Sequence, residues 1–172
     1  DAGVLGEPTQ IHQVVMNLCT NALQAVRGSG RIAVSLDRTQ LGAPRPVTTC
    51  TLPAGDYLRL AVADDGEGMR PEVRERVFDP FFTTRGVGVG TGLGLSLVHG
   101  IVTDLGGGIE VDSAPGHGTC MTAYLPAAAA RVERPAARVA QAESGHGETI
   151  LVVDDDEGLV RLAEETLAVL GY

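Results

Sequence analysis

Five glycines alternate with other residues over positions 86–94, and an apolar helical pattern begins where they end. Residues without a Cβ let backbone N–H groups approach a phosphate, and the N-terminus of the next helix adds a favourable dipole. A dinucleotide-binding loop must follow a strand directly, but here the segment 78–84, which holds all three phenylalanines, intervenes. The pattern predicts a phosphate-binding loop, with a flexible surface loop as the alternative.

Composition excludes several classes of protein. All thirteen basic residues are arginine, and a chain without lysine has no P-loop nucleotide site and no Schiff-base chemistry. The formal net charge of −9 argues against nucleic acid as a partner. No run of 18 apolar residues and no signal-peptide pattern occur, and the three cysteines are scattered. We therefore expect a cytoplasmic segment without direct membrane contact.

Charge divides the 172 residues into three segments. Residues 148–172 carry seven acidic side chains and one arginine, whereas residues 127–147 are rich in Ala, Arg, Pro and small polar residues. The second composition is typical of a linker. We expect a domain over 1–126, a linker over 127–147, and an incomplete second unit over 148–172.

Apolar periodicity predicts an α+β fold within the first 126 residues. Spacings of three and four predict a helix over 8–26, and we expect a short helix over 71–77 and an apolar helix over 93–105. Alternating patterns predict four strands, over 32–36, 57–63, 109–111 and 120–125, with a loop or loose hairpin over 40–55. Because helices and strands do not alternate strictly, we expect helices on one face of a mainly antiparallel sheet.

Two polar clusters are candidate binding groups. Asp64 and Asp65 close a predicted strand before Gly66 and Gly68, where a carboxylate could accept a hydrogen bond from an exocyclic amine; an acidic turn is the alternative. On the first helix, Asn17 and Asn21 are four residues apart, so two amide oxygens could face a hydrated Mg²⁺. A solvated helix face is the alternative there.

The order of these motifs resembles the N, G1, F, G2 and G3 boxes of the sensor histidine kinase ATP-binding domain, in the superfamily shared with gyrase, Hsp90 and MutL. The boxes lie at 13–22, 64–68, 78–82, 90–95 and 116–119. The resemblance covers about residues 7–126. It implies a two-layer α/β sandwich of the histidine kinase ATPase type, with ATP between the sheet and a mobile lid.

The resemblance also implies roles for individual residues. Asn21 would bind Mg²⁺, Asn17 would lie near the phosphates, and Arg85 would be a basic lid residue. Asp64 would hold the adenine amine. Further contacts to ATP are implied at Gly66, Gly68, Phe78, Phe82, Gly90, Thr91, Gly92, Leu93, Gly94 and Thr119.

Several positions depart from the family pattern. Gln24 and Ala25 stand where many members have a basic residue and a tyrosine, which predicts a modest affinity for ATP. Glu7 is a weaker N-cap than the usual aspartate. ATPase branches place a glutamate base at the position of Asn17, so we expect poor hydrolysis and presentation of ATP to another acceptor.

A phosphoacceptor is the missing part. None of the four histidines, at 12, 99, 117 and 146, has the acidic, basic and proline neighbours of a kinase phosphoacceptor. We therefore expect a fragment without the helical dimerisation segment that would precede Asp1. The expected partners are that dimerisation and phosphoacceptor domain and a response-regulator receiver domain. The sequence leaves open whether the parent protein is membrane-anchored.

The tail resembles the opening βα unit of a receiver domain. An apolar run over 149–153 precedes Asp154 and Asp155, which would form part of an Mg²⁺ pocket, and a leucine stripe follows. The resemblance therefore points to a hybrid sensor kinase. The alternatives are a non-catalytic nucleotide-binding regulator and a serine/threonine kinase of the anti-sigma type, although a receiver-like tail argues against the latter.

Overall fold

The computed structural model describes residues 3–26, 30–84, 91–128, 148–153, 163–168 and 171–172. Contacts divide the chain into two units, Asp1–Arg131 and Val132–Tyr172, and each is described by itself. No described helix is long and apolar enough to cross a membrane. The candidate site lies entirely within the first unit.

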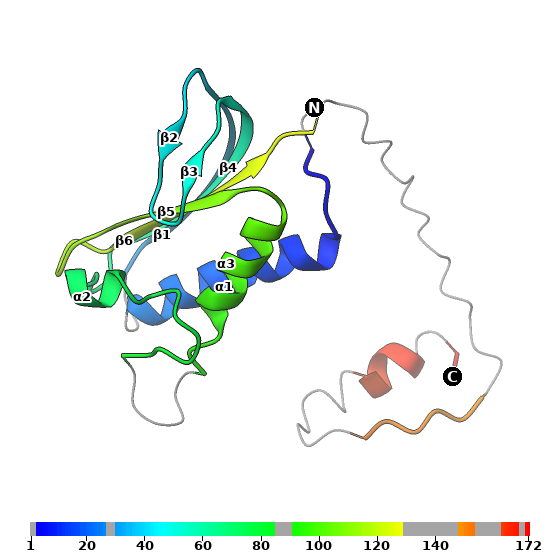
Figure 1. Ribbon diagram of the computed structural model, residues 1–172. Coiled ribbons are helices and arrows are strands. Elements are labelled where there is room, and N and C mark those ends of the chain that lie inside the picture. Colours follow the sequence, from blue (N-terminus) through cyan, green and yellow to red (C-terminus); the bar gives the residue numbers. More distant parts are fainter. Residues whose placement is uncertain (1–2, 27–29, 85–90, 129–147, 154–162, 169–170) are drawn as a thin grey trace. The chain divides into compact units, whose positions relative to one another are not determined.

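A four-stranded antiparallel sheet forms one layer of the first unit (Figure 1). The strands are β1 (Ile32–Leu41), β4 (Gly55–Asp64), β5 (Gly108–Ser113) and β6 (Thr119–Pro126). Their order is β1-β4-β6-β5, so β4 and β6 form the centre of the sheet. The pairing of these two strands ends with Asp64 opposite Thr119. The predicted antiparallel sheet is confirmed, and each strand is longer than its alternating pattern indicated.

Helices α1 (Pro8–Ala25) and α3 (Gly94–Asp104) form the second layer, on one face of the sheet (Figure 1). Pro8 begins α1, and the N-cap Glu7 makes no capping hydrogen bond through its side chain, in keeping with its weak capping preference. The core between the layers consists of apolar residues from both helices and from β4, β5 and β6, among them Val14, Leu18, Val62, Val98, Val102, Ile109 and Met121. This arrangement confirms the predicted two-layer sandwich.

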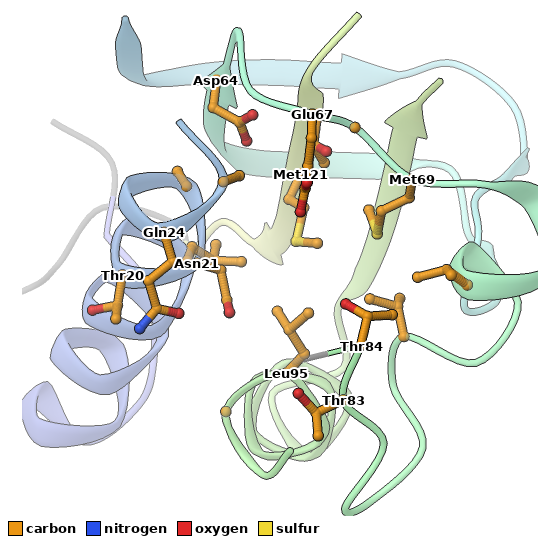
Figure 2. Close-up of a pocket in the computed structure, with 18 of the residues that line it drawn as sticks. Thr20, Asn21, Gln24, Asp64, Glu67, Met69, Thr83, Thr84, Leu95 and Met121 are labelled. Carbon is orange, nitrogen blue, oxygen red and sulfur yellow. The ribbon is translucent and has the colours of Figure 1, made fainter. Parts of the chain in front are cut away.

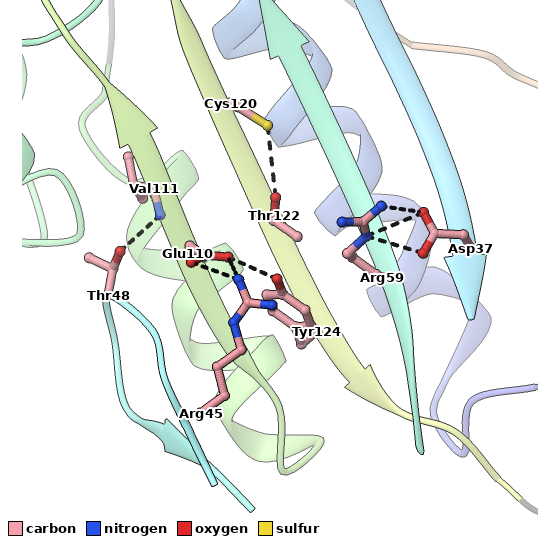
Figure 3. A network of polar contacts seen from close by, with 9 residues as sticks. All are labelled: Asp37, Arg45, Thr48, Arg59, Glu110, Val111, Cys120, Thr122 and Tyr124. Atoms are coloured by element: carbon pink, nitrogen blue, oxygen red, sulfur yellow. Dashed lines mark hydrogen bonds and ion pairs between the residues drawn. The ribbon is translucent and has the colours of Figure 1, made fainter. Parts of the chain in front are cut away.

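A small hairpin of β2 (Arg45–Pro46) and β3 (Thr51–Leu52) packs on the sheet beside the edge strand β5, whose Ile109 N–H donates to the hydroxyl of Thr49 in the turn. Leu52 of the hairpin packs with Tyr57 and Tyr124 of the sheet in a second apolar cluster. Arg45 donates two hydrogen bonds to Glu110, at 2.9 and 3.1 Å, and the Tyr124 hydroxyl donates a third at 2.8 Å (Figure 3). The segment expected to be a loop or loose hairpin is therefore fixed to the sheet by packing and by charge.

The second unit is described in less detail. Residues 163–168 are helical, within the predicted leucine stripe. The receiver resemblance implies a strand over the apolar run 149–153, and this is wrong, because residues 148–153 lie in no strand. A single strand leaves its backbone groups without partners, and β-propensity alone does not supply a neighbour. Asp154 and Asp155 lie outside the described residues.

Candidate functional site

A pocket of about 660 Å³ lies between α1, the ends of β4 and β6, helix α2 (Pro71–Arg74) and the start of α3 (Figure 2). It brings together residues from all five predicted boxes, namely Asn17, Asn21, Asp64, Gly68, Phe82, Thr91, Gly92, Gly94 and Thr119. Gly66, Phe78 and Leu93 are described but do not line it. Arg85 and Gly90 lie outside the described residues.

The two asparagines of α1 are oriented by backbone bonds within the helix. The Asn17 amide nitrogen donates to the Gln13 carbonyl, and the Asn21 amide nitrogen donates to the Asn17 carbonyl, both at 2.9 Å. A carbonyl only accepts, so these bonds fix which end of each amide is nitrogen. The amide oxygens are therefore the ends left for the pocket that both side chains line.

The first residue of α3 contacts this pair. A Cβ at Gly94 would lie 2.8 Å from the Asn17 amide oxygen, so only glycine lets the two helices meet here without moving that oxygen. No acidic residue occupies the first turn of α3. The positive end of α3 thus adjoins the Asn17 amide oxygen, and Asn21 lines the same pocket. This arrangement suits an anion that carries a cation with it.

At the other end of the pocket, Asp64 closes β4. One carboxylate oxygen accepts the Gly66 N–H at 2.9 Å. A Cβ at Gly66 would lie 2.5 Å from the Ala25 carbonyl oxygen, which explains why this glycine lies behind the pocket. Gly66 therefore holds the aspartate against the end of α1 and leaves its second oxygen available.

Two glycine turns pack on each other at this end. Gly68 (φ 64°) and Gly118 (φ 73°) have backbone conformations that favour glycine. A Cβ at Gly68 would overlap the Ala114 carbonyl, and one at Gly118 would overlap the Asp64 carbonyl. The floor of the pocket therefore depends on both glycines, although only Gly68 was predicted as a site residue.

Apolar side chains form the walls. Figure 2 shows Met69, Leu95 and Met121 around the space below Asp64. Sequence reasoning missed Met69, Val73, Val77 and Leu95 as lining residues, since apolar residues beside a motif give the same signal as core residues. Gln24 and Ala25 also line the pocket, at the positions where many members of the family have a basic residue and a tyrosine.

The three phenylalanines of the segment 78–82 have different surroundings. The Phe82 ring lines the pocket and lies 4.4 Å from the Arg76 guanidinium carbon. The Phe78 ring lies 5.4 Å from the His99 ring of α3 and packs against the core, which explains its absence from the lining. Phe81 is 74% exposed and has a φ of 65°, an uncommon conformation for a bulky residue.

The polar groups suit Mg²⁺ bound with a phosphate better than a metal held by protein alone. Among the described residues, no group of three His, Cys, Asp or Glu side chains could hold a metal. Mg²⁺ prefers hard oxygen ligands and keeps waters or phosphate oxygens in its shell. The outward amide oxygens of Asn17 and Asn21 match that donor set.

The family model described as histidine kinase-, DNA gyrase B- and HSP90-like ATPase matches residues 6–129. Sensor kinase CckA of Brucella abortus is 36% identical over 160 residues, which are 89% of this chain and 17% of that protein. Sensor histidine kinase ZraS of Klebsiella oxytoca is 38% identical over 124 residues, 72% of this chain and 23% of that protein. This chain therefore spans less than a quarter of either relative. The solved mycobacterial sensor histidine kinase MprB is 28% identical with a TM-score of 0.57, over 73% of this chain and 76% of that one.

Proposed function

We propose that this chain, which belongs to the histidine kinase-, DNA gyrase B- and HSP90-like ATPase family and is a histidine kinase catalytic domain, presents Mg-ATP for γ-phosphoryl transfer to a histidine outside residues 1–172. The observation that carries this is the convergence of Asp64, the paired amides of α1 and the start of α3 on one pocket. The carboxylate suits an amine, the amide oxygens suit a cation, and the start of the helix suits a phosphate.

Each group has a separate task in this proposal. The free oxygen of Asp64 accepts a hydrogen bond from the adenine amine. The first N–H groups of α3 and the amide oxygen of Asn21 position the polyphosphate and its cation. Phosphoryl transfer needs mainly such positioning and charge stabilisation, and little covalent chemistry from the protein.

Magnesium would be held by Asn21, with Asn17 beside it. When bound, it neutralises the charge of the phosphate oxygens. The chain itself supplies oxygen donors that are oriented before any ligand arrives, because their nitrogen ends are already bonded to α1 carbonyls.

The absence of a base at position 17 supports transfer rather than hydrolysis. An amide has no lone pair that accepts a proton from water at neutral pH, whereas a carboxylate does. No histidine belongs to the described lining of the pocket. His99 contacts Phe78, and His117 lies 3.1 Å from the Pro115 carbonyl oxygen. These contacts favour an acceptor on another domain.

We further propose that the parent is a hybrid kinase whose receiver domain begins near residue 148. The similarity with the Brucella kinase covers 89% of this chain, which is more than residues 1–147 make up, so it extends into the acidic tail. The partners would be a helical dimerisation and phosphoacceptor domain and a receiver domain. We place the segment in the cytoplasm, where ATP is available.

Transfer to a supplied helical domain tests the proposal. The chain, a dimerisation domain with its phosphoacceptor histidine, and γ-labelled Mg-ATP should give labelled histidine. Asn21→Ala should reduce the rate at least tenfold, whereas Leu23→Ala, on the same helix but exposed and outside the pocket lining, should leave it unchanged. ATP binding without any transfer would support the non-catalytic regulator instead.

A further inference from the structure

Asp64, Thr119 and Ser113 lie in one row across three strands. The register pairs Asp64 of β4 with Thr119 of β6, and Thr119 with Ser113 of β5. Directly paired residues of an antiparallel sheet point to the same face. The row therefore lies on the face that holds the pocket, with Thr119 between the proposed base-binding carboxylate and a serine that does not line the pocket.

The Ser113 hydroxyl is surrounded by three hydrogen-bonding groups. It accepts the Met69 N–H at 2.9 Å, donates to the Gly118 carbonyl at 3.0 Å, and lies 2.9 Å from the Thr119 hydroxyl oxygen. A hydroxyl has one hydrogen, and a carbonyl can only accept. Because the serine hydrogen goes to Gly118, the remaining contact is satisfied only if Thr119 donates to Ser113.

This assignment determines what Thr119 offers to a ligand. Its single hydrogen is used on Ser113, so only oxygen lone pairs are left for the pocket. Thr119 is 8% exposed, which makes a mismatched polar contact costly. The free oxygen of Asp64, in the adjacent place of the row, is also an acceptor.

We infer that Ser113 is a positioning residue for base selection: it fixes the Thr119 hydroxyl as an acceptor, so that this end of the pocket selects a purine with an amino group at position 6 over one with an oxygen there. The inference rests on the proposed ATP site. Adenine presents N–H donors at position 6, whereas hypoxanthine presents an acceptor that would face two acceptors.

Comparing ATP with inosine triphosphate tests the inference, because the two nucleotides differ only at this edge of the base. In the full chain, ATP should bind more tightly. Ser113→Ala frees the Thr119 hydrogen to point into the pocket, so the ratio of the two dissociation constants should fall about fivefold, the factor of about one neutral hydrogen bond. Ser113→Thr keeps a hydroxyl and should keep the wild-type ratio.

A second background separates this effect from a general loosening of the turn. Thr119→Val removes the hydroxyl through which Ser113 acts, so Ser113→Ala should no longer change the ratio there. An equal change in both backgrounds, or no change in either, would overturn the inference. If Ser113→Ala does not fold, Ser113→Val and Ser113→Thr give the same comparison at matched shape.

The failure of the proposed function has a different signature. If the wild-type chain binds neither nucleotide, the ATP site itself is wrong and the inference falls with it. If the wild-type chain prefers ATP and the serine variants keep that preference, only the role of Ser113 is wrong. Circular dichroism of each variant checks that the sheet is intact.

Discussion

The backbone N–H of Phe81 donates a hydrogen bond to the carbonyl of Gly92 at 3.0 Å, and this bond joins the two ends of the segment between the aromatic cluster and α3. The approach is close: a Cβ at Gly92 would lie 2.5 Å from the Phe81 carbonyl carbon, and both residues have positive φ angles of 65° and 66°. The glycine accommodates that conformation freely, whereas the phenylalanine is strained by it.

The strain at Phe81 predicts an unusual order of stability. Its ring is largely exposed, so removing the ring should cost little packing. Phe81→Gly should be more stable than Phe81→Ala by about 1 kcal/mol, because a left-handed conformation costs a residue with a Cβ about that much. At Asp79, whose φ is not positive, the alanine variant should be the more stable one. Urea unfolding measures both pairs, and the same order at both positions would rule out strain at Phe81.

Gly94 should matter for binding and not for folding. Gly94→Ala brings a Cβ to within 2.8 Å of the Asn17 amide oxygen, a side-chain end that can move aside. We expect little change in the free energy of unfolding, but weaker Mg-dependent binding of ATP. Gly100→Ala is the matched control, since nothing lies within 4 Å of its Cβ. It should raise stability by about 0.5–1 kcal/mol and leave the affinity for ATP unchanged. If Gly94→Ala binds Mg-ATP as the wild type does, the asparagine amides of α1 do not take part in binding the cation.

Asp64→Asn should weaken ATP binding by about 1.5–3 kcal/mol, since it replaces a charged acceptor of the base amine with a neutral amide. The amide oxygen can still accept the Gly66 N–H, so the turn should persist. Asp65→Asn is the control, because that carboxylate bonds to the Arg31 N–H at 2.7 Å and does not line the pocket. Calorimetry that gives the two variants the wild-type affinity would remove Asp64 from the site.

The hairpin side of the sheet should lose stability in alkali. Burial raises the pKa of Tyr124, and its hydrogen bond to Glu110 raises the pKa further. Burial also raises the pKa of Tyr57. The stability from each raised pKa is complete below the unfolded value near pH 10 and is lost as pH rises through the folded value. The free energy of unfolding should thus fall above about pH 10, less steeply in Tyr124→Phe; an unchanged slope in that variant would contradict this assignment.

Local patterns in the sequence were sufficient for α1, α3 and the central strands, whereas the helix predicted over 71–77 ends at Arg74. The apolar stripe of the first helix, with its asparagines on another face, predicted both α1 and the side of α1 that lines the pocket. The run over 149–153 shows the limit of the same reasoning, because β-propensity predicts a strand only where a neighbouring strand exists. The hairpin depends on contacts to strands far away in the sequence, such as the bonds from Arg45 to Glu110.

The finer parts of the site depend on register and on backbone conformation. Ser113 reaches Thr119 only because β5 and β6 pair as they do, and nothing in its local sequence marks it. Gly118 belongs to the last glycine motif of the sequence. Its close approach to the Asp64 carbonyl could not be predicted, because it depends on how two turns far apart in the sequence pack together. The positive φ of Phe81 could not be predicted from the sequence, because a bulky residue rarely adopts that conformation.

The destination of the γ-phosphoryl group tests the central claim most directly. The full chain alone, incubated with γ-labelled Mg-ATP, should remain unlabelled at His12, His99, His117 and His146. It should hydrolyse ATP slowly, since it has an amide at position 17, where the ATPase branches have a glutamate base. Adding a dimerisation domain with its histidine should move the label onto that domain as an acid-labile, base-stable phosphoryl group. Rapid labelling of any of the four histidines, or fast hydrolysis by the chain alone, would contradict the account.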